Sequence, residues 1–371
     1  MSAAYDAVVI GGGIVGAATA RALAARGRRV LLLERAMPGS EASGAAAGML
    51  APQIEVLADD PILPLAIAAR ERYGALAAEL DRRTGVNVGY HGGGSVQVAL
   101  DAAEIEPLQR QVGAQCALGL RAEWLDRAAL ARRHPGIGPG ALGALLAPDD
   151  ARVNNVTLTA ALLADAIRCG AEVVDHEEVT GLLVTAARVT GVQTARRRYA
   201  AGAVVVAAGA WSPALKGIPR PLPIEPIRGQ IAVVSWPAGE PTGVLFARHV
   251  YIVPRGDDAL LGSTMESAGF AKETTPGGLA QIFTGTAALL PALASQRVRR
   301  TWAGLRPVTP DGRPLIGPDP DVAGLWYATG HGRKGVLLGP LTGEIVGGLM
   351  LDGATPWDIS PCAVTRFDRR P

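Results

Sequence analysis

The sequence is poor in cysteine and in aromatic residues. Among its 371 residues are three cysteines, and 4% of the chain is aromatic. Cys116, Cys169 and Cys362 lie far apart and form no CxxC pair. This spacing excludes a disulfide framework and a typical zinc site, and it favours a reducing compartment. We therefore expect a cytoplasmic protein without a metal site.

Clustered basic charge and long apolar runs are also missing. The net charge is +2, and Lys216, Lys272 and Lys334 are the only lysines. A nucleic-acid surface would need clustered basic charge with aromatic platforms, so we interpret the short arginine runs at 132–133 and 196–198 as solvated turn ends. The longest apolar stretch, residues 335–351, contains a proline and a glutamate. We expect neither a nucleic-acid partner nor a membrane span.

Apolar residues, at 49% of the chain, are abundant enough for a large core. Short apolar runs without alternation are typical of strands buried on both faces of a parallel sheet. Such runs occupy residues 7–10, 30–33, 203–206 and 325–328. Helices are predicted over residues 14–25, 64–83, 157–168, 278–290 and 335–351. Glycine-rich turns and short strand candidates fill residues 85–144, and residues 216–300 are proline-punctuated and β-rich.

The order of these elements predicts an α/β protein with a mixed α+β part. The parallel strands lie near both ends and in the middle of the chain, so one doubly wound domain is interrupted twice by a mostly antiparallel domain. We place the first domain at residues 1–85, 145–215 and 305–365. The second domain then comprises residues 86–144 and 216–304.

A glycine motif lies between the first two buried strands. Gly11 suits a tight turn, Gly13 allows a pyrophosphate to approach the backbone, and Gly16 allows close helix packing. Glu34 follows the second strand, where a carboxylate can accept ribose hydroxyls. The similar pattern at residues 138–143 contains a proline and follows no buried strand, so we interpret it as a loop. Residues 1–34 therefore predict a βαβ unit for a dinucleotide.

Residues 41–52 are nearly all glycine, alanine and other small residues, which predicts a backbone that lies against a flat ring. With this segment the chain resembles the D-amino-acid oxidase group of flavoproteins, and within it the glycine oxidases of the bacterial thiamine pathway. Further matching motifs are residues 204–212, Trp302 to Pro307 with Asp311, and residues 330–335. The positions that depart from the family pattern are Gly44, Gly332, Lys334 and residues 151–155.

The resemblance implies a Rossmann-like FAD-binding domain of the glutathione-reductase type, an antiparallel substrate domain and non-covalent FAD. The residues that it places around the cofactor are Gly11, Gly13, Ile14, Val15, Gly16, Glu34, Arg35, Ala42, Ser43, Ala46, Ala47, Gly48, Met49, Val179, Ala208, Gly209, His331, Gly332, Arg333, Lys334, Gly335, Val336 and Leu337.

The resemblance also implies a substrate pocket. Arg306 is expected to bind the substrate carboxylate, since a planar guanidinium can do so bidentately; alternatively it anchors a turn with Asp311. Arg333 matches a second active-site arginine, or is a surface arginine at a helix start. Tyr251, His249 and Met265 match pocket positions, although Met265 could equally be a core residue and His249 a structural histidine. We assign no general base.

The implied reaction is oxidative deamination of glycine, sarcosine or small D-amino acids. A hydride passes to the flavin, and O2 then gives H2O2. A role in thiamine thiazole biosynthesis and a homotetramer follow by the same analogy. The alternatives are a D-amino-acid dehydrogenase that passes electrons to a quinone or carrier, and a non-catalytic dinucleotide-binding module.

Overall fold

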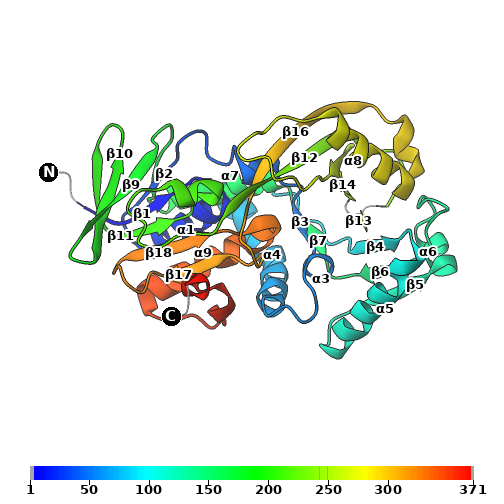
Figure 1. Cartoon of the computed structure of the whole chain (residues 1–371), viewed down its shortest axis with the longest axis horizontal. Helices are drawn as coiled ribbons and strands as arrows, with labels where there is room; N and C mark the ends of the chain where they lie inside the picture. The colour runs from blue at the N-terminus through cyan, green and yellow to red at the C-terminus, as the bar shows by residue number, and fades with distance from the viewer. Residues whose placement is uncertain (1–3, 242, 249, 369–371) are drawn as a thin grey trace.

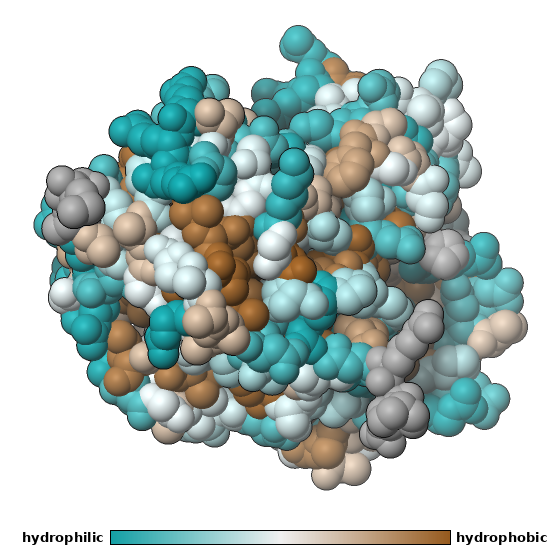
Figure 2. Space-filling view, turned by 60° about the vertical axis from the view of Figure 1, so that its left-hand side comes forward, coloured by the Kyte–Doolittle hydropathy of each residue, from teal (hydrophilic) through white to brown (hydrophobic). Residues whose placement is uncertain are grey.

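The computed structural model describes residues 4–241, 243–248 and 250–368. Two sheets form two parts of the molecule that lie side by side (Figure 1). The surface in Figure 2 is largely hydrophilic and surrounds a central group of apolar side chains. The α/β class predicted from the sequence is confirmed.

The first sheet is mostly parallel, with the spatial order β17-β18-β11-β1-β2-β8. Its strands are β1 (Tyr5–Ile10), β2 (Val30–Leu33), β8 (Glu172–Val174), β11 (Arg198–Val206), β17 (Leu315–Pro318) and β18 (Leu325–Thr329). Strand β17 pairs antiparallel with β18 at one edge. The hairpin β9 (Val179–Thr185) and β10 (Arg188–Thr194) joins β11. The predicted strands are thus found, and β2 is buried along its whole length.

Helices cover one face of this sheet. They are α1 (Ile14–Ala24), α4 (Leu63–Thr84), α7 (Asn155–Arg168) and α9 (Gly335–Asp352). Helix α9 packs on α1 and α4, and their apolar side chains form one core with Val9, Leu32 and Val205 of the sheet. Among the described residues, the helix Gly332–Asp352 is long and apolar enough to cross a membrane, but 61% of its apolar window is buried within the protein.

The second sheet is mostly antiparallel, in the order β16-β12-β15-β14-β13-β4-β6-β5. Its strands are β4 (Ser95–Ala99), β5 (Glu123–Asp126), β6 (Gly143–Ala147), β12 (Glu225–Ser235), β13 (Val244–Ala247), β14 (Val250–Arg255), β15 (Asp258–Gly262) and β16 (Val298–Val308). Helix α8 (Pro276–Leu289) packs on one face. The other face packs on Ala47 and Ala51 of a connecting segment with α2 (Ala42–Ala45), β3 (Met49–Leu50) and α3 (Pro52–Glu55).

The interpretation of residues 85–144 as turns and short strands is incomplete. This stretch also contains helices α5 (Ala102–Ala117) and α6 (Arg127–Arg133). Helix α5 begins with a capping box. The side chain of Asp101 accepts a hydrogen bond from the backbone amide of Glu104, and the side chain of Glu104 accepts one from the backbone amide of Asp101. Pro107 and Gly113 inside the helix weaken its sequence signal, whereas the capping box could have revealed it. Of residues 138–143, which were predicted as a loop, residues 138–142 lie in one, whereas Gly143 begins β6.

The two sheets provide a physical basis for the predicted division into two domains. Strands β6 and β16, however, continue past residues 144 and 304, where the sequence suggested boundaries. We propose the same discontinuous division with these boundaries moved to the ends of the two strands. Each sheet then belongs to one domain.

The contact between α1 and α9 is close enough to be tested by adding one methyl group. A Cβ at Gly343 would lie 2.5 Å from the carbonyl carbon of Ala18, so we expect Gly343→Ala to lower the free energy of unfolding by about 1–3 kcal/mol. Gly113 in α5 is the matched control, because a Cβ there meets nothing within 4 Å. Gly113→Ala should raise stability by about 0.5–1 kcal/mol, because alanine favours a helix. Urea unfolding checks both, and equal effects would contradict the packing argument.

Candidate functional site

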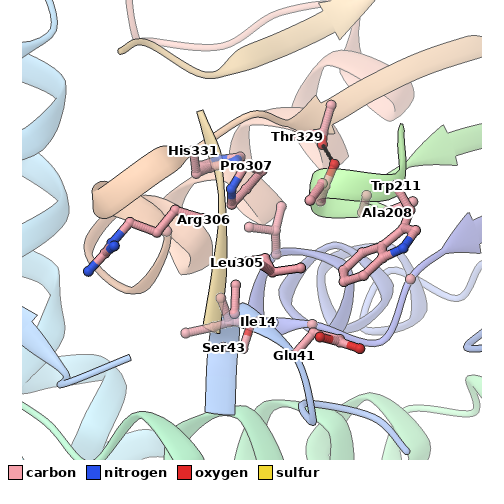
Figure 3. Close-up of a pocket in the computed structure, with 18 of the residues that line it drawn as sticks. Ile14, Glu41, Ser43, Ala208, Trp211, Leu305, Arg306, Pro307, Thr329 and His331 are labelled. Atoms are coloured by element: carbon pink, nitrogen blue, oxygen red, sulfur yellow. Dashed lines mark hydrogen bonds between the residues drawn. The ribbon is translucent and has the colours of Figure 1, made fainter. Parts of the chain in front are cut away.

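A cavity of about 400 Å³ lies between the two sheets. The ends of β1, β2 and β11, the segment of residues 41–49 and residues 328–336 line one part of it. Strands β12, β14 and β16 contribute Gly229, Tyr251 and Arg306 to another part. Figure 3 shows Arg306 on one side of the cavity and Trp211 and Glu41 on the other. The cavity therefore joins the predicted dinucleotide motif to the predicted substrate residues.

The glycine turn after β1 brings the backbone to the cavity wall. A Cβ at Gly11 would lie 2.5 Å from the carbonyl oxygen of Ala207, and the φ of Gly11 is +108°. A Cβ at Gly13 would meet only Ser43 Oγ, at 3.0 Å. Gly13 also precedes α1. The first amide of this helix, that of Ile14, donates to Ser43 Oγ at 2.9 Å, and the next amides of the helix start can bind an anion. The turn therefore has room for a pyrophosphate, which fits FAD.

Glu34 is held in a fixed orientation at the cavity wall. Its Oε2 accepts a hydrogen bond from the amide of Gly12 at 2.7 Å, and its Oε1 accepts one from the amide of Ala36 at 2.9 Å. The residue is 8% exposed. Each carboxylate oxygen keeps a second lone pair, so the group can accept both hydroxyls of a ribose. This arrangement also fits FAD.

The segment of residues 41–49 is held by side chains from outside it. Asn155 Nδ2 donates to the carbonyl of Ser43 at 2.6 Å, and Arg255 Nη2 donates to the carbonyl of Ala47 at 2.9 Å. Arg255 also donates to Asn155 Oδ1 at 2.8 Å. Asn155 belongs to the stretch that departs from the family pattern, and here it supplies a structural hydrogen bond. The small residues of the segment therefore present a fixed wall to the cavity.

Strand β16 approaches this segment closely. Trp302 Nε1 donates to the carbonyl of Ala45 at 3.1 Å. Two residues further on, Gly304 faces Ala45, and a Cβ at Gly304 would lie 2.4 Å from the Cβ of Ala45. The absence of a side chain at Gly304 thus lets the second sheet pack against the segment.

Arg306 extends from β16 into the cavity. Its Nη2 donates to Ser263 Oγ at 2.6 Å, and its Nη1 donates to the carbonyl of Thr264 at 3.2 Å. A Cβ at Gly229 would lie 2.1 Å from Nη1, so this glycine makes room for the guanidinium. Burial lowers the pKa of Arg306, and the nearby hydroxyl of Tyr251 opposes that shift. The guanidinium retains further N–H groups for an anion.

The two alternatives for Arg306 can be separated. Asp311 does not bind Arg306, because its carboxylate accepts both Nε and Nη2 of Arg366, at 2.7 and 3.0 Å. Tyr251 lies instead beside Arg306, is 4% exposed and also lines the cavity. A Cβ at Gly262 would lie 2.5 Å from the hydroxyl of Tyr251. The geometry supports a cavity role for Arg306 over a turn anchor.

Arg333 lies in the cavity lining but already has a partner. Its Nε and Nη2 donate to Glu55 Oε1 at 3.0 and 2.7 Å. The Glu55 side chain is 4% exposed and that of Arg333 is 38% exposed. The Glu55 carboxylate raises the pKa of Arg333. Arg333 is therefore an ion-paired group at the exposed side of the cavity, and neither of the sequence interpretations included Glu55.

Several predicted residues lie elsewhere. Met265 does not line the cavity and is 51% exposed, so it is neither a core residue nor part of this wall. A Cβ at Gly16 would lie 1.9 Å from the carbonyl of Gly11, so Gly16 serves packing. Lys334 donates to the carbonyl of Gly312 at 3.1 Å, and Leu337 is in the core. His249 lies outside the described residues.

The remaining predicted cofactor residues do line the cavity. They are Ile14, Val15, Arg35, Ala42, Ser43, Ala46, Gly48, Met49, Val179, Ala208, Gly209, His331, Gly332, Gly335 and Val336, beside the residues already described. Trp211, Glu41 and Glu55 line it too and were not predicted. Trp211 belongs to the motif at residues 204–212, which could have indicated it.

His331 is buried in the cavity wall. Its Nε2 lies 3.0 Å from Thr342 Oγ1, and the residue is 3% exposed. Burial lowers the pKa of His331 to about 3. The ring is therefore neutral at physiological pH and cannot contribute a positive charge to the cavity.

Known proteins are similar to this chain in both sequence and fold. The family described as "FAD dependent oxidoreductase" matches residues 6–349. The glycine oxidase of Geobacillus kaustophilus is 35% identical, over 99% of this chain and 98% of that protein. The crystal structure of glycine oxidase from that organism superposes with a TM-score of 0.94, at 34% identity and 98% coverage of both chains.

A second kind of relative is longer. The bifunctional protein ThiO/ThiG of Trichormus variabilis is 35% identical over 98% of this chain, which spans 55% of its length. The chain thus corresponds to nearly all of one relative and to about half of the other.

The buried His331 predicts a pH dependence of stability. A histidine in the unfolded chain titrates near pH 6.5, so between pH 6.5 and about 3 the unfolded state binds more protons and the folded state loses stability as the pH falls. The loss from this group is about 2 kcal/mol at pH 5.

We expect His331→Gln to remove that part of the decrease in unfolding free energy between pH 7.5 and 5, measured at constant FAD. The exposed His176 is the control, and His176→Asn should behave like wild type. A wild-type pH dependence in His331→Gln would contradict the argument.

Proposed function

The chain belongs to the FAD-dependent oxidoreductase family, and from this premise we propose that it oxidises glycine and other small amines such as sarcosine or small D-amino acids. Bound FAD supplies a hydride acceptor. The observation that carries the proposal is the position of Arg306 and Tyr251 in the same cavity as the dinucleotide motif. The relatives named glycine oxidase support the choice of substrate.

Arg306 is suited to hold an amino-acid carboxylate. Its guanidinium is anchored by Ser263 and Thr264 and is therefore fixed before a substrate arrives. Tyr251, beside it, can donate its hydroxyl to the same carboxylate. Holding the carboxylate at this point fixes the Cα of the substrate relative to the wall formed by residues 41–49.

We assign no general base within the cavity. His331, the histidine among the described lining residues, is neutral, but its Nε2 is engaged with Thr342. Glu55 is engaged with Arg333. We therefore expect the substrate amine to lose its proton to water.

The acceptor of the electrons distinguishes the proposed oxidase from a dehydrogenase. An oxidase reduces O2 to H2O2, whereas a dehydrogenase passes electrons to a quinone or carrier. The purified yellow protein is mixed in air with glycine, sarcosine, D-alanine or D-proline, and peroxide and dye reduction are followed in parallel. We expect peroxide in step with amine consumption. Rapid dye reduction without peroxide would favour the dehydrogenase.

Pathway and assembly follow from the relatives by analogy. The similarity to the bifunctional ThiO/ThiG proteins supports a role in thiamine biosynthesis. The low cysteine content supports a cytoplasmic location. We also propose a homotetramer, which sedimentation of the purified protein tests.

Removing the guanidinium of Arg306 should weaken substrate binding. We expect Arg306→Met to lower kcat/KM for glycine about 100- to 1,000-fold, because a buried charge pair with the carboxylate is lost. The flavin absorbance should stay. Arg299→Met is the matched control on the same strand, since Arg299 pairs with Asp258 at 2.8 Å and is 47% exposed. Equal kcat/KM values for wild type and Arg306→Met would show that another group binds the carboxylate.

A further inference from the structure

An exposed loop from the second sheet reaches across to the first domain. Residues 267–274 form the outer part of the connection between β15 and α8, and they are exposed or partly exposed to solvent. The ring of Phe270 lies 5.3 Å from that of Trp211, measured between centroids. Lys272 Nζ lies 3.2 and 3.1 Å from the two carboxylate oxygens of Glu41. The loop thus has an aromatic and an ionic contact with the other domain.

Both contacts fall on residues that line the cavity. Trp211 and Glu41 form its wall on the side away from Arg306 (Figure 3). Arg35 joins them, since its guanidinium carbon lies 3.5 Å from the centre of the Trp211 ring and its Nη2 donates to Glu41 Oε1 at 2.7 Å. Arg35 directly follows Glu34, the predicted ribose ligand. The loop therefore rests on the nucleotide end of the cavity.

The two ends of the loop are fixed by one buried side chain. Gln230 on β12 is 0% exposed. Its Nε2 donates to Glu266 Oε1 at 2.9 Å and to Thr275 Oγ1 at 3.0 Å, and its Oε1 accepts from the amide of Thr275 at 2.8 Å. A Cβ at Gly278 would lie 2.3 Å from Gln230 Nε2, so that position has room only for glycine. A compact loop with its ends held together is frequently functional.

The two ends of the loop are therefore fixed by buried hydrogen bonds, whereas its tip, which carries Phe270 and Lys272, is held by exposed contacts. Phe270 is 52% exposed, and the Lys272 side chain is 46% exposed. Exposed contacts of this kind are weak and break by local opening, whereas the buried hydrogen bonds of Gln230 at the two ends of the loop stay formed. We propose that residues 267–274 form a clasp that closes the nucleotide end of the cavity and slows the release of FAD. The tip detaches from Trp211 and Glu41 when the cofactor leaves.

The release rate of FAD tests the clasp directly. Holoprotein is diluted without any amine, and the rise in flavin fluorescence as FAD dissociates gives the rate. We expect Phe270→Ala to release FAD about fivefold faster, Lys272→Ala about twofold faster, and the double variant about tenfold faster. Phe270→Tyr keeps the ring and should keep the wild-type rate. Added salt should speed release from wild type but not from Lys272→Ala.

The exposed neighbour Glu273 provides the matched control, and Glu273→Ala should release FAD at the wild-type rate. If the double variant is purified without flavin, Phe270→Leu and Lys272→Ala give the same comparison. Release from the double variant within twofold of wild type would overturn the clasp. Because no substrate is present, that result would leave the proposed amine oxidation untouched.

Discussion

The close approach of the second sheet to the segment of residues 41–49 is the constraint on which the site depends. Gly304 on β16 faces Ala45 with no space for another carbon atom, and Trp302 holds the carbonyl of Ala45. Larger residues on either side would push the sheets apart. The cavity beside this contact has its present width because small residues, Gly304 and Ala45, meet at the point of closest approach.

That approach also brings the two halves of the site together. The dinucleotide motif belongs to the parallel sheet, whereas Arg306 and Tyr251 belong to the antiparallel sheet. Within the second sheet, Gly229 and Gly262 leave room for these two large side chains. The relative position of the cofactor half and the substrate half is therefore set by the packing between the two parts. The loop carrying Phe270 and Lys272 adds a second, weaker connection between the same two parts.

Local sequence patterns were sufficient for much of the fold. The buried strands, the glycine turn with Glu34 and the long helices α4, α7 and α9 were predicted close to their observed bounds, because their apolar periodicity and end signals are local. Helix α5 was missed because Pro107 and Gly113 obscure that periodicity. The motif at residues 204–212 was recognised, yet the place of Trp211 in the cavity wall was not.

The sequence by itself determined the βαβ unit, the family and the pair of candidate arginines, since each depends on residue type and short spacing. Tertiary structure alone decided what each arginine contacts. Arg306 is anchored by Ser263 and Thr264, residues some 40 positions away, and Arg333 is neutralised by Glu55 from the opposite end of the chain. The exposed position of Met265 is likewise a result of the tertiary structure. Ion pairs, burial and room for a side chain arise from contacts between distant segments, and no local pattern records them.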